Sequence, residues 1–341
     1  MEYNNFCDKD FYQYEGRILE KDGVAYLGYT NSYVRFYARG EQVRAYLISN
    51  ITEDVNMAGL SVFLDDCDEA VNKIVIDKEE AWYDICELPD KEEHLVTIVK
   101  ITEAAMSHVG LVKLQIENGE LLNREFPKRP ELKLEFIGDS ITCGYGVLGA
   151  PDAEYTLRDE DGMLTYAYLA AKELNARARF LSASGHGMYV EYTGDPEGNV
   201  PKLFPCVNWY IDPAVAYDYN EYVPDVVVIN LGTNDSGHIE KPQVQEMFVK
   251  TYVEFLHTIK RAYPQTKIIC TIGTLCDIMF DWIEKAIAIY EDEGGRDVYM
   301  RRLPYHNVEE DGMACMHPSA ITHRKDGERV AGFIKEILDM R

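Results

Sequence analysis

Short apolar runs separated by turn residues fill the first 125 residues of the chain. The runs are rich in β-branched and aromatic residues, and many alternate apolar with polar positions, as at residues 34–37 and 96–99. Eight runs follow this pattern: residues 24–29, 33–37, 42–48, 60–64, 73–76, 82–86, 95–101 and 111–116. Short alternating strands at close spacing are typical of a β-sandwich or a jelly roll. We therefore predict an all-β domain over residues 1–126.

The hydrophobic period changes after residues 127–130, which read Pro-Lys-Arg-Pro. Two runs, at 132–137 and 226–231, are almost continuously apolar, as expected of parallel strands covered on both faces. Two shorter strand candidates are residues 178–182 and 267–272. Apolar residues recur at helical spacing in four segments: residues 166–174, 244–262, 282–290 and 319–340. This alternation predicts an α/β fold over residues 131–341, in which helices cover both faces of a mostly parallel sheet to give three α/β/α layers.

Acidic residues outnumber basic ones across the whole chain. The sequence holds 59 Asp and Glu against 34 Lys and Arg, which gives a formal net charge of −25. Such a chain repels nucleic-acid phosphates and anionic membranes, so we exclude both as partners. No apolar run reaches transmembrane length and no secretory signal is visible, so we expect a cytoplasmic protein. The eight cysteines form no metal-type pair, and we interpret them as reduced thiols and expect no metal site.

One stretch, residues 132–146, carries a candidate nucleophile. Its apolar run breaks abruptly into Gly138-Asp139-Ser140, and two more glycines follow. The pattern predicts a buried strand, a tight turn and the start of a helix. Sheets of α/β proteins place ligands at the carboxyl ends of their strands, and N–H groups at a helix start can bind developing negative charge. Ser140 is therefore well placed for nucleophilic attack.

Three later blocks also combine small and polar residues at predicted strand or helix ends. Gly185 and Asn234 each follow a predicted strand, and His317 precedes the final helix. Together with Ser140, these blocks supply a hydroxyl, glycine N–H groups, a side-chain amide and an imidazole. Acyl transfer uses these groups, because a serine attacks, a histidine takes its proton and fixed donors hold the oxyanion.

These four blocks, in this order, resemble the SGNH (GDSL-type) hydrolase superfamily. With an all-β domain ahead of Gly-Asp-Ser-Ile-Thr-Cys-Gly-Tyr-Gly, the chain further resembles carbohydrate esterase family 2, which includes acetylxylan esterases. The resemblance implies a jelly-roll domain followed by an SGNH hydrolase domain, and a serine esterase that removes acetyl groups from carbohydrate esters. It implies an acetylated sugar or oligosaccharide as substrate, no cofactor and no metal. It does not indicate an oligomeric state.

The resemblance also implies a role for each block. Ser140 would be the nucleophile and His317 the general base. The N–H groups of Ser140 and Gly185 and the side-chain amide of Asn234 would form the oxyanion hole. Other SGNH enzymes mostly carry an aspartate three residues before the histidine, where this chain has Ala314. Either a backbone carbonyl orients the imidazole, giving the Ser–His dyad that family 2 implies, or Asp311 reaches back to it; we favour the dyad.

Two other functions fit parts of the sequence. The chain could be a carbohydrate-binding protein on a catalytically silent SGNH scaffold, for which the missing aspartate is the argument. It could also be an esterase or lipase acting on non-sugar acyl esters. We interpret His186 and His238, which lie close in sequence to the candidate residues, as pocket-wall or surface groups.

Overall fold

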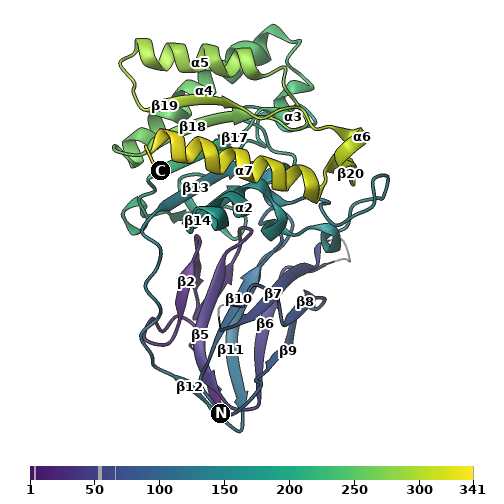
Figure 1. Ribbon diagram of the computed structural model, residues 1–341, viewed down its shortest axis with the longest axis vertical. Coiled ribbons are helices and arrows are strands. Elements are labelled where there is room, and N and C mark those ends of the chain that lie inside the picture. Colours follow the sequence, from purple (N-terminus) through teal and green to yellow (C-terminus); the bar gives the residue numbers. More distant parts are fainter. Residues whose placement is uncertain (4, 53–55, 66, 341) are drawn as a thin grey trace.

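The computed structural model describes residues 1–3, 5–52, 56–65 and 67–340. Strands form the amino-terminal part of the molecule, and a helix-covered sheet forms the carboxyl-terminal part (Figure 1). This confirms the predicted fold class, an all-β sandwich followed by an α/β unit with a parallel sheet. The limits 1–126 and 131–341 for two separate domains stay a prediction.

Two antiparallel sheets make up the sandwich. One has the order β3-β4-β11-β6-β9 with β1 beside β11, and the other has the order β12-β5-β10-β7-β8 with β2 beside β5. The strands are β1 (Glu2–Tyr3), β2 (Gln13–Glu15), β3 (Leu19–Lys21), β4 (Val24–Leu27), β5 (Tyr33–Arg39), β6 (Gln42–Ser49), β7 (Ala58–Leu64), β8 (Asn72–Ile76), β9 (Glu80–Glu87), β10 (His94–Lys100), β11 (Val109–Glu117) and β12 (Glu120–Leu122). Alternate residues of both sheets point inward and form one core, with Phe36 and Ala45 among them. All eight predicted strands are present.

Five parallel strands form the central sheet of the second part, in the order β14-β13-β17-β18-β19. They are β13 (Lys133–Gly138), β14 (Arg177–Ser182), β17 (Val226–Asn230), β18 (Lys267–Ile272) and β19 (Val298–Arg302). The sequence predicted the first four of these strands and missed β19. This edge strand is only partly buried and ends in Arg301 and Arg302, so it lacks the continuous apolar run of a central strand.

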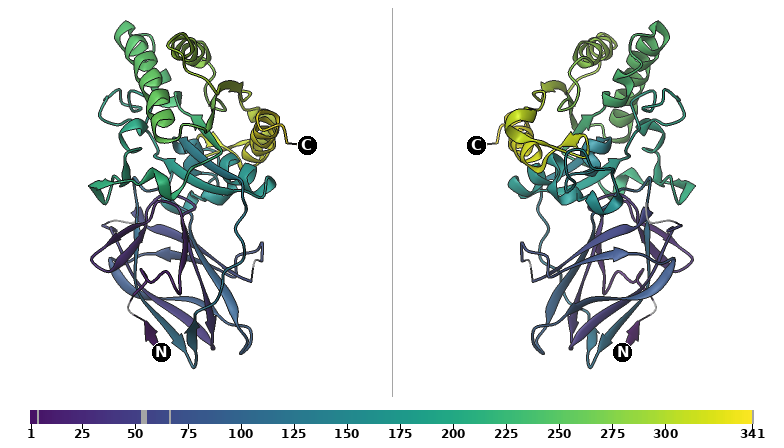
Figure 2. Two further views of the ribbon diagram at one scale, coloured as in Figure 1. Left: turned by 90° about the vertical axis from the view of Figure 1, so that its left-hand side faces the viewer. Right: turned by 90° about the vertical axis from the view of Figure 1, so that its right-hand side faces the viewer.

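Helices cover both faces of this sheet (Figure 2). The longer ones are α2 (Tyr166–Glu173), α4 (Pro242–Ala262), α5 (Phe280–Asp292) and α7 (Ala320–Ile337). Helices α2 and α7 pack with Phe136 and Val228 on one face, whereas α4 and α5 pack with Ile137 and Ile229 on the other. The remaining elements are short: α1 (Ser140–Cys143), η2 (Leu157–Asp159), η3 (Gly162–Leu164), η4 (Val200–Lys202), β15 (Cys206–Asn208), β16 (Asp212–Ala216), η5 (Tyr219–Glu221), α3 (Thr233–Ser236), α6 (Val308–Asp311), β20 (Met313–Ala314) and β21 (His317–Pro318). In the part of the chain that the structure describes, no helix has the length and apolar character needed to cross a membrane.

A buried ion pair joins the sandwich to the α/β part. Arg17 follows β2, and its Nη2 lies 2.9 Å from Oε1 of Glu135 in β13. Neither side chain has exposed surface. The other terminal nitrogen, Nη1, donates to the carbonyls of Phe204 and Cys206 at 2.7 and 3.0 Å. The guanidinium therefore has a carboxylate and two carbonyls from the α/β part as partners.

A second buried carboxylate lies at the same junction. Glu15 of β2 accepts hydrogen bonds from Arg129, Arg177 and Arg179 at 2.9, 2.7 and 3.1 Å. Burial alone would raise the pKa of Glu15, but the hydrogen bond from Arg177 and the three positive charges outweigh it and lower the pKa. The carboxylates of Glu135 and Glu15 are therefore both buried at this junction and paired with arginines.

Replacing Arg17 by methionine tests how much this junction contributes to stability. Arg17→Met keeps most of the side-chain volume but leaves Glu135 buried and unpaired, which costs about 3–5 kcal/mol. We expect the free energy of unfolding, measured by urea denaturation, to fall by that amount.

Lys21→Met is the matched control, because Lys21 forms an exposed ion pair with Asp212 across the same junction. Solvent screens that pair, so its loss should leave the denaturation midpoint unchanged. Equal midpoint shifts in the two variants would contradict the importance of the buried pair.

Candidate active site

Ser140 lies where β13 turns into α1. The strand ends at Gly138, and a side chain at this position would overlap the hydroxyl of Thr142 one turn later, so the tight turn requires glycine. Asp139 caps the helix, with Oδ1 accepting the Ile141 N–H at 3.0 Å. Burial raises the pKa of Asp139 to about 7. Ser140 is the first residue of the helix and is 6% exposed.

His317 contacts Ser140 directly. Its Nε2 lies 2.9 Å from the Ser140 Oγ, and its Nδ1 lies 3.1 Å from the carbonyl oxygen of Cys315. A carbonyl only accepts, so Nδ1 carries the hydrogen and Nε2 is left with a lone pair facing the serine hydroxyl. Burial lowers the pKa of His317, and the hydrogen bond to the Cys315 carbonyl offsets this only in part. The imidazole is therefore in the tautomer that can accept the proton of Ser140.

The Asp311 carboxylate forms no hydrogen bond with His317. Its Oδ1 accepts a hydrogen bond from Lys325 Nζ at 2.6 Å. The sequence left two groups that could orient the His317 imidazole, a backbone carbonyl and Asp311. Of these, the backbone carbonyl of Cys315 lies within hydrogen-bond distance.

A strained two-residue turn aims that carbonyl at the imidazole. Strands β20 and β21 pair as a hairpin whose loop residues, Cys315 and Met316, have φ angles of 46° and 61°. Positive φ at both positions is the pattern of a type I′ turn, which normally selects Asn and Gly. The N–H groups of Cys315 and Met316 donate to the carbonyls of Ala150 and Pro151, which holds the turn in place.

Asn234 contacts the loop that contains Gly185, through the carbonyl of His186. Gly185 follows β14 with a φ of 75°, in the left-handed region that favours glycine. The Asn234 amide donates to the carbonyl of His186 at 2.8 Å, which leaves its second N–H for another acceptor. Among the described residues, the N–H groups of Ser140 and Gly185 donate to no protein acceptor. The turn thus presents free donors in a polar, half-buried setting.

Asp235 anchors the loop that follows this turn. Its carboxylate accepts the N–H groups of Met188, Tyr189 and Val190 at 2.8, 2.8 and 2.9 Å. The Asp235 side chain thus reaches a segment 45 residues and more away in the sequence. No local pattern in the sequence reveals such a contact.

Two stacked tyrosine rings lie beside His317. The ring of Tyr145 lies 4.4 Å from that of His317, and Tyr155 stacks on Tyr145 at 3.6 Å between centroids. His186 bonds with the Ser184 carbonyl and the Tyr210 hydroxyl.

His238 bonds with the Tyr192 carbonyl. Neither His186 nor His238 bonds with Ser140 or His317, and their interpretation as pocket-wall or surface groups stays a prediction.

The strain in the hairpin turn gives a stability prediction. The Met316 side chain is 63% exposed, whereas its backbone is held in the left-handed region. Asparagine adopts that region more readily, so Met316→Asn should raise the free energy of unfolding by about 1 kcal/mol without loss of the turn. Thermal denaturation measures the change. The same substitution at exposed Met340, where φ is not positive, should give no gain, and a gain there of equal size would contradict the strain argument.

Two family models match the chain. The model of the GDSL-like lipase/acylhydrolase family matches residues 136–324, and that of the carbohydrate esterase 2 N-terminal domain matches residues 14–124. The first match covers more than half of the chain and includes Ser140, Gly185, Asn234 and His317.

Curated relatives and a solved structure agree with these matches. Cellulase/esterase CelE of Acetivibrio thermocellus is 33% identical over 257 residues, which cover 74% of this chain and 31% of CelE. An acetylxylan esterase / glucomannan deacetylase of Cellvibrio japonicus is 24% identical over 273 residues, covering 78% of this chain and 73% of that protein. The chain thus spans about a third of CelE.

Among solved structures, a family two carbohydrate esterase from Clostridium thermocellum in complex with cellohexaose has a TM-score of 0.87 and 27% identity, over 97% of this chain and 100% of the other. The resemblance predicted from the four sequence blocks is therefore confirmed. This chain belongs to the GDSL-like lipase/acylhydrolase family; its amino-terminal part matches the carbohydrate esterase 2 N-terminal model, and the chain is similar to family 2 carbohydrate esterases.

Proposed function

We propose that the protein is a serine esterase that removes acetyl groups from carbohydrate esters through a Ser140–His317 dyad. The observation that carries the proposal is the pair of contacts to one imidazole, with Nε2 at 2.9 Å from Ser140 Oγ and Nδ1 on the Cys315 carbonyl. A histidine fixed in this tautomer, next to a serine at a helix start, is the arrangement that nucleophilic acyl transfer requires.

The reaction follows from these contacts. Ser140 Oγ attacks the ester carbonyl while its proton moves to Nε2 of His317, which forms a tetrahedral oxyanion. The N–H groups of Ser140 and Gly185 and the free amide N–H of Asn234 hold that oxygen. The bond to the sugar oxygen then breaks, His317 returns the proton to that oxygen, and an acetyl-enzyme remains. Water, deprotonated by the same imidazole, releases acetate and restores Ser140.

A neutral sugar is the substrate that we infer. The names of two relatives specify esterases, one of them for acetylxylan and glucomannan, and the solved relative binds cellohexaose. In this chain, the Tyr192 N–H donates to the Gly185 carbonyl at 2.9 Å, and Tyr192 is 69% exposed. An exposed aromatic face held beside the oxyanion turn is suited to packing on a sugar ring.

Two substitutions test the dyad and the oxyanion donors. Ser140→Ala removes the attacking atom and should lower kcat on 4-nitrophenyl acetate by at least about 10⁴-fold. Asn234→Ala removes one donor and should lower kcat by about 10²–10³-fold with a smaller change in KM. Thermal denaturation serves as the control for folding, because Asn234 also bonds to the His186 carbonyl.

Full activity of Ser140→Ala would refute the mechanism. Labelling of the wild type by a fluorophosphonate would exclude a silent binding scaffold, because only an activated serine reacts. A preference for octanoyl or longer esters over acetylated oligosaccharides would favour the lipase alternative.

The pH dependence of kcat/KM tests the state of His317. Burial lowers the pKa of this imidazole below its ordinary value of 6.5, so the neutral base persists to lower pH than a solvent-exposed histidine would. We expect activity to be constant above neutrality and to fall only as the pH drops through a midpoint below 6.5. A midpoint above 6.5 would mean that a nearby negative charge, and not a carbonyl, faces Nδ1.

A further inference from the structure

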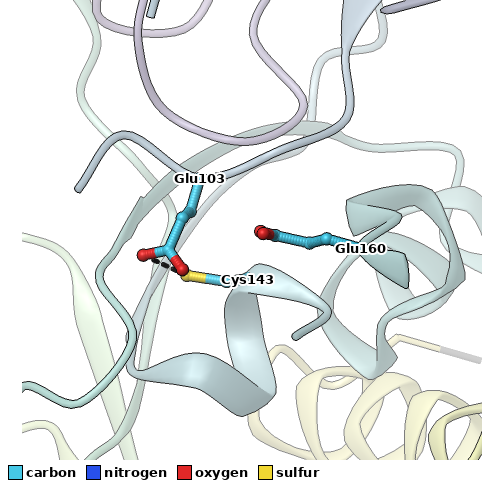
Figure 3. Close-up of side chains that lie close together, drawn as sticks. All are labelled: Glu103, Cys143 and Glu160. Atoms are coloured by element: carbon cyan, nitrogen blue, oxygen red, sulfur yellow. Dashed lines mark hydrogen bonds between the residues drawn. The ribbon is translucent and has the colours of Figure 1, made fainter. Parts of the chain in front are cut away.

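Two glutamates from different parts of the fold meet in the interior beside the active site (Figure 3). Glu103 lies in the loop that follows β10 of the sandwich, and Glu160 follows η2 in the α/β part. Cys143 of α1 completes the cluster, and one ligand atom from each of the three side chains lies within 4.8 Å of the others. All three residues are buried.

Burying two carboxyl groups this close is costly, and both cannot carry a charge cheaply. Burial raises the pKa of Glu103. Burial together with the charge of Glu103 raises the pKa of Glu160 well above its ordinary value. Apolar side chains in these positions would avoid the cost of burying two carboxyl groups. Packing alone therefore does not explain the cluster.

The carboxylate of Glu103 bonds to the turn that contains Gly185. Its Oε2 accepts the N–H of Ser184 at 2.8 Å, and the next N–H along the chain is the Gly185 donor. On the other side of Gly185, the His186 carbonyl accepts from Asn234. The residues on both sides of Gly185 are therefore held by side chains: Ser184 by Glu103 of the sandwich, and His186 by Asn234 of the α/β part.

Hydrogen bonds hold the loop that carries Glu103. The buried Lys100 Nζ donates to the carbonyls of Thr102 and Glu103 at 2.5 and 2.9 Å. The N–H of Gly162 donates to the Ile101 carbonyl at 2.8 Å, which ties the loop to the α/β part. These bonds fix the backbone from which the Glu103 side chain reaches Ser184.

We propose that Glu103 is a positioning residue for the oxyanion hole: by holding the Ser184 N–H, it orients the Gly185 N–H toward the ester oxygen. The proposal rests on the proposed esterase function. It assigns part of the active-site geometry to the sandwich, which contributes no atom to the dyad. Without the Glu103 contact, the peptide between Ala183 and Ser184 can rotate, and the donor at Gly185 turns with it.

Two conservative substitutions separate this role from a need for charge or volume. Glu103→Gln removes the charge but keeps an oxygen that can accept the Ser184 N–H, so it should keep kcat within about threefold of wild type. Glu103→Asp keeps the charge but withdraws the carboxylate by one methylene, so it should lower kcat at least tenfold with KM within about twofold. This tenfold loss of kcat is smaller than the loss of about 10²–10³-fold that follows removal of a donor, because here the donor is misaligned and not absent.

Glu160→Gln is the matched control. Glu160 is as deeply buried, but its Oε2 accepts from the Tyr155 hydroxyl at 2.6 Å, away from Ser184, and a glutamine oxygen can do the same. Its kcat should stay within about threefold of wild type. Thermal denaturation of all three variants shows which have folded normally, and inhibition by an alkyl boronic acid, which mimics the oxyanion, should weaken at least tenfold in Glu103→Asp alone.

Wild-type kcat in Glu103→Asp, or an equal loss in Glu103→Gln, would overturn the proposal. So would a metal ion bound stoichiometrically to the purified wild type and required for activity, because Glu103 would then be a ligand. These outcomes are distinct from failure of the esterase function, which would appear as a wild type that neither hydrolyses 4-nitrophenyl acetate nor reacts with a fluorophosphonate.

Discussion

The buried pair of Arg17 and Glu135 fixes the strand on which the active site depends. Glu135 lies in β13, five residues before Ser140, and its partner comes from the sandwich. Two charges without exposed surface are costly to remove from water, and they are tolerated only when the geometry satisfies them. The ion pair therefore fixes the position of β13 against the sandwich, and with it the position of the turn at Ser140.

A carbonyl in place of a carboxylate changes the chemistry of the histidine. The Cys315 carbonyl is a dipole and holds the same tautomer that an aspartate would hold, but it stabilises the imidazolium less. The base therefore remains neutral to lower pH, and the ion formed during the reaction receives less support. The strained turn at Cys315 and Met316 is the structural cost of this arrangement, as is common where function requires an unusual backbone.

The sequence allowed much of this to be predicted, for identifiable reasons. Strand periodicity revealed β4 to β11, and continuous apolar runs revealed the inner strands of the parallel sheet. Four short blocks led to the prediction of Ser140, Gly185, Asn234 and His317 as site residues, because each block lies at the end of a regular element. The edge strand β19 has no such run, and strands of two or three residues have no measurable period.

Other features leave no trace in the sequence. Any residue supplies a backbone carbonyl, so nothing marks Cys315 as the partner of His317. The contact between Glu103 and Ser184 spans 81 residues and depends on how the two parts pack. Glu103 itself lies in a short loop whose sequence is unremarkable.

The loop around Glu103 has a consequence for how this architecture can be recombined. Proteins built from separable modules can exchange one module for another when the surfaces between them are passive. Here Arg17 and Glu103 both extend from the sandwich into the α/β part, where Arg17 pairs with Glu135 of the strand that leads to Ser140 and Glu103 binds the Ser184 N–H beside Gly185. An α/β part transplanted to a new neighbour would keep every dyad atom and still lack these two contacts. The sandwich and the α/β part should therefore be transferred together. An α/β part joined to another domain would work only if that domain supplied equivalents of Arg17 and Glu103.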